Sequence, residues 1–241
     1  MIDITSFSIL DKRGDRLLDD IDLNIDTDEL TVICGRPGSG KTLLLKAIKG
    51  IVSEGLKHEG KIETEGRIGL IFQEPRKQIV RRNVKMEAAF DLENLCYERR
   101  EIESKIHEFA KFLDAEYLLE KDIDEVSHGE MTKIALLSTL VTHPEIILFD
   151  EPLSTLDHTN RKMLLELIRR LKQNGTSIVI AEHDLRDIVG LSDRIILLRD
   201  GKISCDGRPN DLKKELHREG IKIPFSWELE VLGGEYGADQ D

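Results

Sequence analysis

Short apolar runs rich in β-branched residues recur along the chain and predict buried strands. They read LTVICG, RIGLIF, EIILFD, TSIVIA and RIILLR. Between them, apolar residues return at helical spacing, as at Leu164, Ile168 and Leu171. Strands that alternate with helices are typical of a parallel sheet covered by helices. The pattern therefore predicts an α/β fold.

The middle third of the chain interrupts this alternation. Helix-like sequence alone fills residues 83–142, which we expect to form a helical subdomain inserted into a core of residues 1–82 and 143–215. Its apolar positions return at helical spacing, as at Ile102, Ile106, Phe109 and Leu113. A C-terminal extension is expected at 216–232. The acidic, glycine-rich end GGEYGADQD, at 233–241, predicts a flexible tail.

The composition fits a soluble folded protein, because 39% of the 241 residues are hydrophobic and 34% are charged. No apolar run approaches the length that spans a bilayer, and the start MIDITSFSIL lacks the features of a signal peptide. The three cysteines are scattered, without the spacing of a disulfide framework or a metal site. We therefore expect a cytosolic protein. A net charge of −12 argues against general nucleic-acid binding.

The segment GRPGSGKT follows one strand-like run and opens the helix-like LLLKAIKG. Strand, glycine-rich turn and helix together form the context of a phosphate-binding P-loop, with backbone N–H groups aimed at an anion beside a helix N-terminus. Lys41 is expected to reach the outer phosphates and Thr42 to ligate Mg²⁺. The nucleotide-binding residues of this segment are Gly35, Pro37, Gly38, Ser39, Gly40, Lys41, Thr42 and Leu43. The alternative is a glycine-rich turn without a ligand.

Two acidic residues follow the apolar strand in IILFDEP. Asp150 is expected at the carboxyl end of the strand, where ligands bind in open α/β sheets, and there it would hold the metal. Glu151 would orient or deprotonate the attacking water. A plain turn after a strand is the competing interpretation.

The segment VSHGE opens another helix-like run. Ser127 followed three residues later by Glu130 is a capping box, which satisfies free N–H groups at a helix start. The same exposed N-terminus is also suited to bind phosphate. The residues themselves allow both interpretations.

With these motifs in this order, nearly the whole chain resembles the ATP-binding cassette (ABC) family. Gln73 in IFQEP resembles the glutamine loop that senses the γ-phosphate, and Asp157, which ends STLD, resembles the loop at the dimer interface. His183 in IAEHD matches the switch histidine that contacts the γ-phosphate. The resemblance implies catalytic roles for Lys41 and Gln73 as well, with Gln73 also a metal ligand.

The family fold is a P-loop NTPase with a mainly parallel sheet core, an antiparallel β part and an inserted α-helical subdomain. We expect it over residues 1–232. VSHGE stands where the family signature, usually Leu-Ser-Gly-Gly-Gln, is found. Ser127, Gly129 and Glu130 would then meet the γ-phosphate held by a second protomer. His128 and Glu130 depart from the signature by adding a side chain and a negative charge near phosphate.

The base-binding position departs from the family too. Members stack an aromatic ring on adenine, whereas alignment of ITSFSI by eye places Ile9 there. Loss of stacking removes on the order of 1 kcal/mol or more. We therefore expect weak discrimination between ATP and GTP.

Three further stretches resemble the ATPase subunits of energy-coupling factor importers, which take up vitamins, cobalt or nickel. They are IFQEPRKQIV, EAAFDLENL and LHREGIKIPFSWELEVL. This resemblance implies a second ABC protomer, identical or not, a transmembrane coupling subunit and a separate substrate-binding membrane subunit. The protein would lie at the cytoplasmic face of the membrane. A groove beside Gln73 would receive helices of the coupling subunit.

Other functions remain open at this stage. They are a soluble ABC ATPase acting on a macromolecular assembly such as iron–sulfur cluster assembly, a regulatory nucleotide-binding subunit with weak hydrolysis, and a P-loop metabolite kinase. A basic cluster is either solvated surface or a contact with acidic lipid or a coupling subunit. It consists of Arg76, Lys77, Arg81, Arg82 and Lys85.

Overall fold

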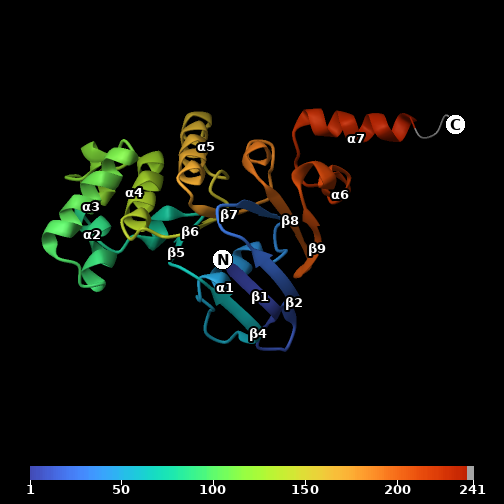
Figure 1. The fold of residues 1–241 in the computed structure, drawn as a ribbon, viewed down its shortest axis with the longest axis horizontal. Coiled ribbons are helices and arrows are strands. Elements are labelled where there is room, and N and C mark those ends of the chain that lie inside the picture. Colours follow the sequence, from blue (N-terminus) through green and yellow to red (C-terminus); the bar gives the residue numbers. More distant parts are fainter. Residues whose placement is uncertain (238–241) are drawn as a thin grey trace.

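A computed structural model describes residues 1–237 of the chain (Figure 1). A six-stranded sheet in the order β5-β6-β7-β3-β8-β9 forms its centre. The strands are β5 (Ile68–Ile71), β6 (Ile146–Asp150), β7 (Ser177–Glu182), β3 (Leu30–Cys34), β8 (Arg194–Arg199) and β9 (Lys202–Gly207). All neighbours pair in parallel except β8 and β9. The predicted α/β fold with a mainly parallel sheet is confirmed.

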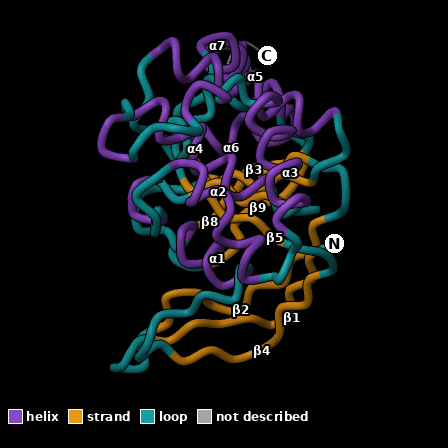
Figure 2. Tube along the Cα trace, turned by 90° about the vertical axis from the view of Figure 1, so that its left-hand side faces the viewer, coloured by secondary structure: helices purple, strands orange, loops and turns teal. Residues whose placement is uncertain are grey.

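A second sheet supplies the antiparallel part of the fold. Its order is β2-β1-β4, formed by β1 (Ile2–Leu10), β2 (Arg16–Ile25) and β4 (Lys57–Thr64). Figure 2 shows these strands projecting below the rest of the molecule. Helix α1 (Lys41–Ile48) contributes Leu44, Leu45 and Ile48 to the hydrophobic core that this sheet shares with one face of the central sheet. The start of α1 is thereby fixed between two sheets.

A second and larger core covers the opposite face of the central sheet. Phe149 of β6 and Ile178 of β7 pack there with Leu164 and Ile168 of α5 (His158–Gln173). Side chains of a strand alternate between its faces, so Ile33 of β3 lies in the first core while its neighbours lie in the second. The carboxyl ends of β3, β6 and β7 remain at one edge, where the loops carry the polar motifs.

Helices alone occupy the segment predicted to be a helical subdomain. They are α2 (Val84–Asn94), α3 (Arg99–Phe112), α4 (His128–Leu140) and the 3₁₀ turns Glu116–Leu118 and Ile123–Glu125. Figure 1 shows α2, α3 and α4 gathered at the β5 end of the sheet. Asn83 begins α2 because its side chain accepts hydrogen bonds from the backbone N–H groups of Lys85 and Met86. Further 3₁₀ turns are Pro75–Gln78, Val189–Leu191 and Pro209–Leu212.

Two helices, α6 (Lys213–Arg218) and α7 (Phe225–Gly237), end the described chain. Residues 233–237, which begin the predicted flexible tail, continue α7. Helical hydrogen bonding propagates through the glycines once the preceding turns have formed. The rest of the predicted tail, 238–241, lies outside the described residues. Among the described helices, none combines the length and the apolar character needed to cross a bilayer.

Candidate active site

The predicted P-loop connects β3 to α1. Gly40 precedes α1 with φ 104, and a Cβ on it would lie 2.7 Å from Leu18 Cδ2, so glycine is required. Lys41 is buried, and its ammonium donates to the carbonyl oxygens of Gly35 at 2.8 Å and Arg36 at 3.3 Å. The loop therefore wraps around its own lysine, as a phosphate cradle requires.

Two of the three residues expected to hold a metal lie in contact. Thr42 Oγ1 donates to Asp150 Oδ1 at 2.8 Å, and burial raises the pKa of Asp150. A hydroxyl and a carboxylate are oxygen ligands of the kind that Mg²⁺ prefers, so this pair fits the ion. Gln73, the third expected ligand, joins the group through Glu151 instead, because its Nε2 donates to Glu151 Oε2 at 3.2 Å.

Glu151 lies at the centre of the predicted catalytic residues. Its Oε1 lies 3.7 Å from Lys41 Nζ, and its Oε2 lies 3.6 Å from His183 Nδ1. With Gln73 on the same carboxylate, all four predicted catalytic side chains converge. Glu151 also has a φ of 44, which is uncommon for a residue with a side chain. Backbone strain of this kind concentrates at functional sites, since the surrounding structure must maintain it.

The capping box at the start of α4 is confirmed. Ser127 Oγ accepts from the Glu130 N–H at 3.3 Å, and Glu130 Oε2 accepts from the Ser127 N–H at 2.7 Å. Glu130 Oε1 also accepts from Lys121 Nζ at 3.1 Å. The bonds from Ser127, and then Lys121, lower the pKa of Glu130 to about 2. The carboxylate stays ionised but is turned toward its own helix, with a cation beside it.

The start of α4 also packs against the segment that follows Glu151. His128 Nε2 lies 3.0 Å from Thr155 Oγ1, which holds the unusual signature side chain against its own chain. A Cβ on Gly129 would come within 2.4 Å of Asn160 Oδ1, so a larger residue would have to displace the Asn160 side chain. Asp157 caps α5 by accepting from the Asn160 N–H at 2.9 Å. Signature, interface loop and α5 therefore form one packed unit.

Within a single chain, the start of α4 makes no direct polar contact with the P-loop among the described residues. Among residues 1–237, no hydrogen bond or ion pair joins Ser127, Gly129 or Asp157 to the P-loop. The predicted nucleotide residues thus fall into two groups. One contains the P-loop, Asp150, Glu151, Gln73 and His183, and the other contains the start of α4 and Asp157.

The expected base contact at Ile9 is corrected by the structure. Ile9 has 0% exposure and pairs with Leu18 inside the core between the sheets. Its side chain therefore faces away from any nucleotide. Alignment by sequence found the right strand, but it did not reveal which face the side chain occupies. Leu17 is apolar and exposed and lies beside the P-loop, with its carbonyl oxygen 3.4 Å from the position of a Cβ on Gly40.

Most of the basic cluster is paired with acidic neighbours. Arg76 bonds Asp124, and Lys77 bonds Glu74 at 2.6 Å. Arg82 lies 3.9 Å from Asp122, while the guanidinium of Arg81 stacks over the Phe90 ring at 4.8 Å. This pairing favours the interpretation of the cluster as solvated surface.

Two residues of the site were missed by sequence reasoning. Glu182 is buried directly before His183, and Arg161 connects the loop after β6 with the loop after β7. The only signal for Glu182 was an acidic residue at the end of an apolar strand. Arg161 lies in α5, which carries many charged residues, and no sequence pattern distinguishes it from them.

A mainly parallel sheet with a P-loop after one strand and an Asp-Glu pair after another is characteristic of P-loop NTPases. A family model described as "ABC transporter" matches residues 18–154, more than half of the chain. The chain therefore belongs to the ABC transporter family. It is an ABC-type ATPase, and ATP is the nucleotide that the family binds.

Curated relatives agree with this assignment. The energy-coupling factor transporter ATP-binding protein EcfA1 of Bacillus subtilis is 34% identical over 239 residues, covering 92% of this chain and 84% of that protein. EcfA1 of Halalkalibacterium halodurans is 29% identical, with coverage of 92% and 84%. A putative ABC transporter ATP-binding protein of Halobacterium salinarum is 30% identical, with coverage of 90% and 98%.

Solved structures share the fold. CbiO1 of Clostridium perfringens, described as part of the ABC transporter complex CbiONQ, has a TM-score of 0.78 at 23% identity, covering 90% of this chain and 94% of its own. The ATP-binding cassette MJ0796, in a dimer bound to ADP and Pi, has a TM-score of 0.75 at 22% identity, with coverage of 87% and 99%. At these identities the likeness concerns the fold alone.

Proposed function

We propose that the protein is the ATP-hydrolysing subunit of an energy-coupling factor importer. Two ABC protomers would close around ATP at the cytoplasmic face of the membrane and move a separate coupling subunit, while another membrane subunit binds the transported substrate. The likeness to EcfA1 of two bacteria supports this branch of the family. The division of the nucleotide residues into two groups supports the dimer.

The arrangement of these two groups supports a dimer. The N–H groups at the start of α4 and the exposed Asp157 belong to one surface unit, separate from the P-loop of the same chain. A helix N-terminus attracts negative charge, so it is suited to the γ-phosphate of a nucleotide held elsewhere. A second protomer supplies that nucleotide. Each composite site would then combine one P-loop with the signature of its partner.

Hydrolysis in this site would depend on positioning and charge neutralisation. Thr42 and Asp150 would hold Mg²⁺, which supplies charge neutralisation on the phosphates when bound. Glu151 would orient a water in line with the γ-phosphate, and Gln73 would hold the Glu151 carboxylate. Lys41 and His183 would stabilise the negative charge that develops in the transition state. ATP binding would close the dimer and hydrolysis would open it.

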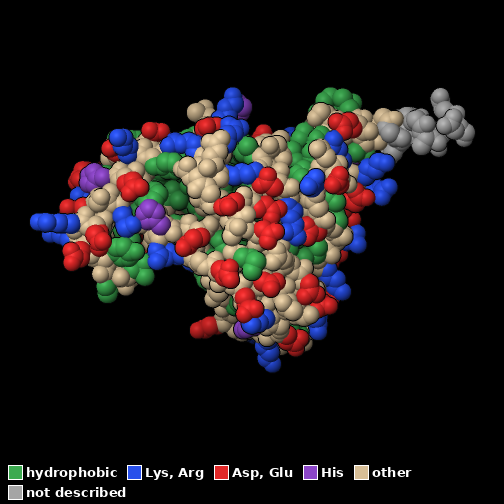
Figure 3. All heavy atoms as spheres, viewed as in Figure 1, with side chains coloured by type: hydrophobic (Ala, Val, Ile, Leu, Met, Phe, Trp, Pro, Cys, Tyr) green, Lys and Arg blue, Asp and Glu red, His purple; other side chains and the backbone are tan. Residues whose placement is uncertain are grey.

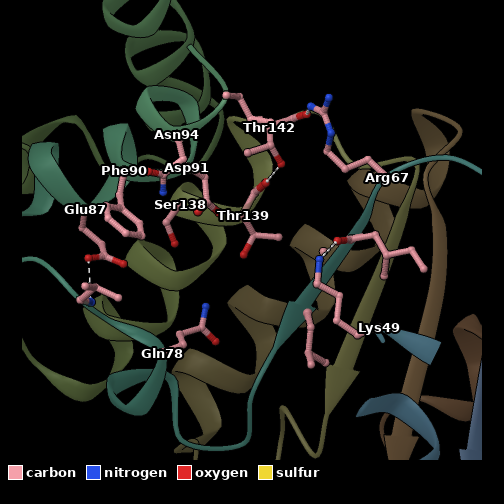
Figure 4. A pocket seen from close by; sticks show the side chains of 15 residues that line it. Lys49, Arg67, Gln78, Glu87, Phe90, Asp91, Asn94, Ser138, Thr139 and Thr142 are labelled. Carbon is pink, nitrogen blue, oxygen red and sulfur yellow. Dashed lines mark hydrogen bonds between the residues drawn. The ribbon is translucent and has the colours of Figure 1, made fainter. Parts of the chain in front are cut away.

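A groove between the sheet and the helical segment supports coupling to a membrane subunit. It forms a cavity of about 460 Å³, walled on one side by α2 and α4 and on the other by Lys49 and Arg67 (Figure 4). Gln78 lines it, and its Oε1 accepts from the Phe72 N–H at 3.1 Å, next to Gln73. A helix in this groove would therefore push on the segment that carries Gln73. Exposed Val80 and Leu95 offer it apolar contacts.

The dimer is tested with Glu151→Gln, which leaves the phosphate cradle intact but removes the charge expected to activate water. We expect hydrolysis to fall by at least a hundredfold and a dimer to accumulate with magnesium ATP, measured by gel filtration and light scattering. Glu166→Gln, on the exposed surface of α5, is the control. A particle that stays monomeric under these conditions contradicts the dimer.

The membrane partner is tested by isolating the full chain from native membranes and identifying bound proteins by mass spectrometry. Val80→Asp, in the groove, should release the chain from membranes, because a charge would face the apolar contacts of a docked helix. Leu229→Asp is the matched control, since Val80 is 65% and Leu229 54% exposed. Copurification with a soluble assembly and no membrane protein would instead support the soluble alternative.

A further inference from the structure

Glu182 is a buried acidic residue in the site without a role in the scheme above. It ends β7, is 1% exposed and directly precedes His183. Carboxylates this deeply buried are rare unless their oxygens are hydrogen-bonded. Burial raises the pKa of Glu182 to about 7, although three backbone N–H groups act in the opposite direction. Burying an ionisable group at this position destabilises the folded state more than burying a neutral one would. A role for the carboxylate would explain why it is present.

The carboxylate of Glu182 bridges two loops. Its Oε1 accepts from the Leu153 N–H at 3.1 Å, and its Oε2 accepts from the His183 N–H at 3.2 Å. Leu153 lies in the loop that begins at Glu151 and ends at Asp157. His183 opens the loop that follows β7. A single side chain thus connects the loop of the water-orienting residue with the loop of the switch histidine.

A second bridge joins the same loops from the other side. Arg161 donates to the Leu153 carbonyl oxygen at 3.0 Å and to Asp187 at 2.8 Å. Both polar groups of the Leu153 backbone are therefore bound, one by Glu182 and the other by Arg161. The position of Glu151, two residues earlier, depends on how Leu153 is held.

The ring of His183 also depends on this carboxylate. Its Nδ1 is buried without a hydrogen-bond partner among residues 1–237, and it lies 3.8 Å from Glu182 Oε2 and 3.6 Å from Glu151 Oε2. These separations are too long for hydrogen bonds. The ring is thus placed by its backbone, and Glu182 holds the N–H group of that backbone.

We propose that Glu182 is a positioning residue for ATP hydrolysis, whose carboxylate locks the Glu151 loop to the His183 loop so that both side chains reach the γ-phosphate together. Its buried side chain acts through the backbone of these loops. Loss of the bridge lets the two loops move independently, and a misplacement of about 1 Å at a reacting centre costs up to a hundredfold in rate. ATP binding should be spared, because the P-loop lysine is held by Gly35 and Arg36. The proposal rests on the roles assigned to Glu151 and His183.

The test compares Glu182→Ala and Glu182→Gln with wild type, in the full chain. We expect the alanine variant to lower kcat at least tenfold while the Kd for a fluorescent ATP analogue changes less than threefold. The glutamine variant should recover part of the rate, because its amide oxygen still accepts one N–H. Ser177→Ala is the matched control. Ser177 is buried at the other end of β7 and accepts from the Asp28 N–H at 2.9 Å, so its loss breaks one strand-end bond far from the loops.

Unchanged kcat in a folded Glu182→Ala protein would overturn the proposal, as would equal losses in kcat and ATP affinity. Loss of the fold in both variants, seen by circular dichroism, would assign Glu182 a structural role only. Activity of Glu151→Gln distinguishes failure of the positioning role of Glu182 from failure of the catalytic roles assigned to Glu151 and His183. If that variant is inactive while Glu182→Ala turns over normally, only the positioning role fails. If Glu151→Gln remains active, both are wrong.

Discussion

Thr42 Oγ1 and Asp150 Oδ1 lie 2.8 Å apart, although 108 positions separate the two residues in the chain. The first belongs to α1 after β3, and the second ends β6, with β7 between these strands. Parallel strands bring their carboxyl ends to one edge of a sheet, and this places a hydroxyl beside a carboxylate. Sheet order, which no local pattern specifies, therefore brings together the pair that we propose holds magnesium.

The response to magnesium should therefore depend on the hydroxyl of Thr42. Thr42→Val leaves Asp150 without this donor, and we expect magnesium to lose most of its effect on ATP binding, measured by titration with and without the ion. Thr42→Ser should retain it. Thr31→Val is the control, because the buried Thr31 hydroxyl has no hydrogen-bond partner among the described residues. If magnesium still changed ATP binding by Thr42→Val as it does for the wild type, Thr42 would not be a metal ligand.

Ser127 should have two separable effects, since it caps α4 and, in the proposed dimer, faces the partner. Ser127→Ala removes the acceptor for the Glu130 N–H, and we expect the free energy of unfolding to fall by about 1 kcal/mol in denaturant titrations. The Glu151→Gln background should also lose its ATP-dependent dimer. Ser127→Thr preserves the oxygen and should restore stability. Dimer formation that survives Ser127→Ala would mean that the serine is a cap only.

The stability of the protein should fall between acidic and neutral pH because of Glu182. Burial raises its pKa from 4.5 to about 7, so the folded state binds this proton more tightly than the unfolded state does. The free energy of unfolding therefore decreases as pH rises from about 4.5 to about 7, by up to about 3 kcal/mol. Glu182→Gln should lack this decrease when the two proteins are unfolded in parallel, whereas Ser177→Ala should keep it. Parallel pH profiles for wild type and Glu182→Gln would show that the group does not titrate in this range.

The side chain of Ile9 lies in the core, and the exposed Leu17 beside the P-loop has no aromatic ring to stack on a base, so nucleotide base selectivity should be weak. We expect ATP and GTP to bind with affinities within about tenfold of each other in competition experiments, since stacking contributes on the order of 1 kcal/mol or more. Ile9→Tyr should lower stability by roughly 1–3 kcal/mol through overpacking, without improving ATP affinity. A hundredfold preference of the wild type for ATP would contradict this expectation.

Figure 3 shows basic and acidic side chains mixed on the surface, and ion pairs between them change how the basic cluster of the sequence is interpreted. Basic and acidic side chains alternate over the helical segment, and Arg76 and Lys77 face Asp124 and Glu74. The sequence brings five basic residues close together, but the acidic partner of Arg76 comes from 48 positions away. Only the fold reveals that these charges are largely compensated.

The sequence by itself determined the motifs whose chemistry is local. A P-loop needs glycines, a lysine and a hydroxyl at fixed spacing, and the capping box at Ser127 needs one residue three positions later, so both follow from short stretches. The five parallel strands of the central sheet were predicted from their apolar runs, and helices such as α5 from the helical spacing of their apolar residues.

Tertiary structure alone decided which faces are buried and which loops meet. In the folded protein Ile9 lies in the core and α7 extends past Gly233. The Glu130 carboxylate accepts a hydrogen bond from Lys121. The tertiary structure also joins Leu153 to His183 through Glu182. These contacts connect residues that are distant in the chain, and their energies depend on desolvation and on the distance between groups, which only packing determines.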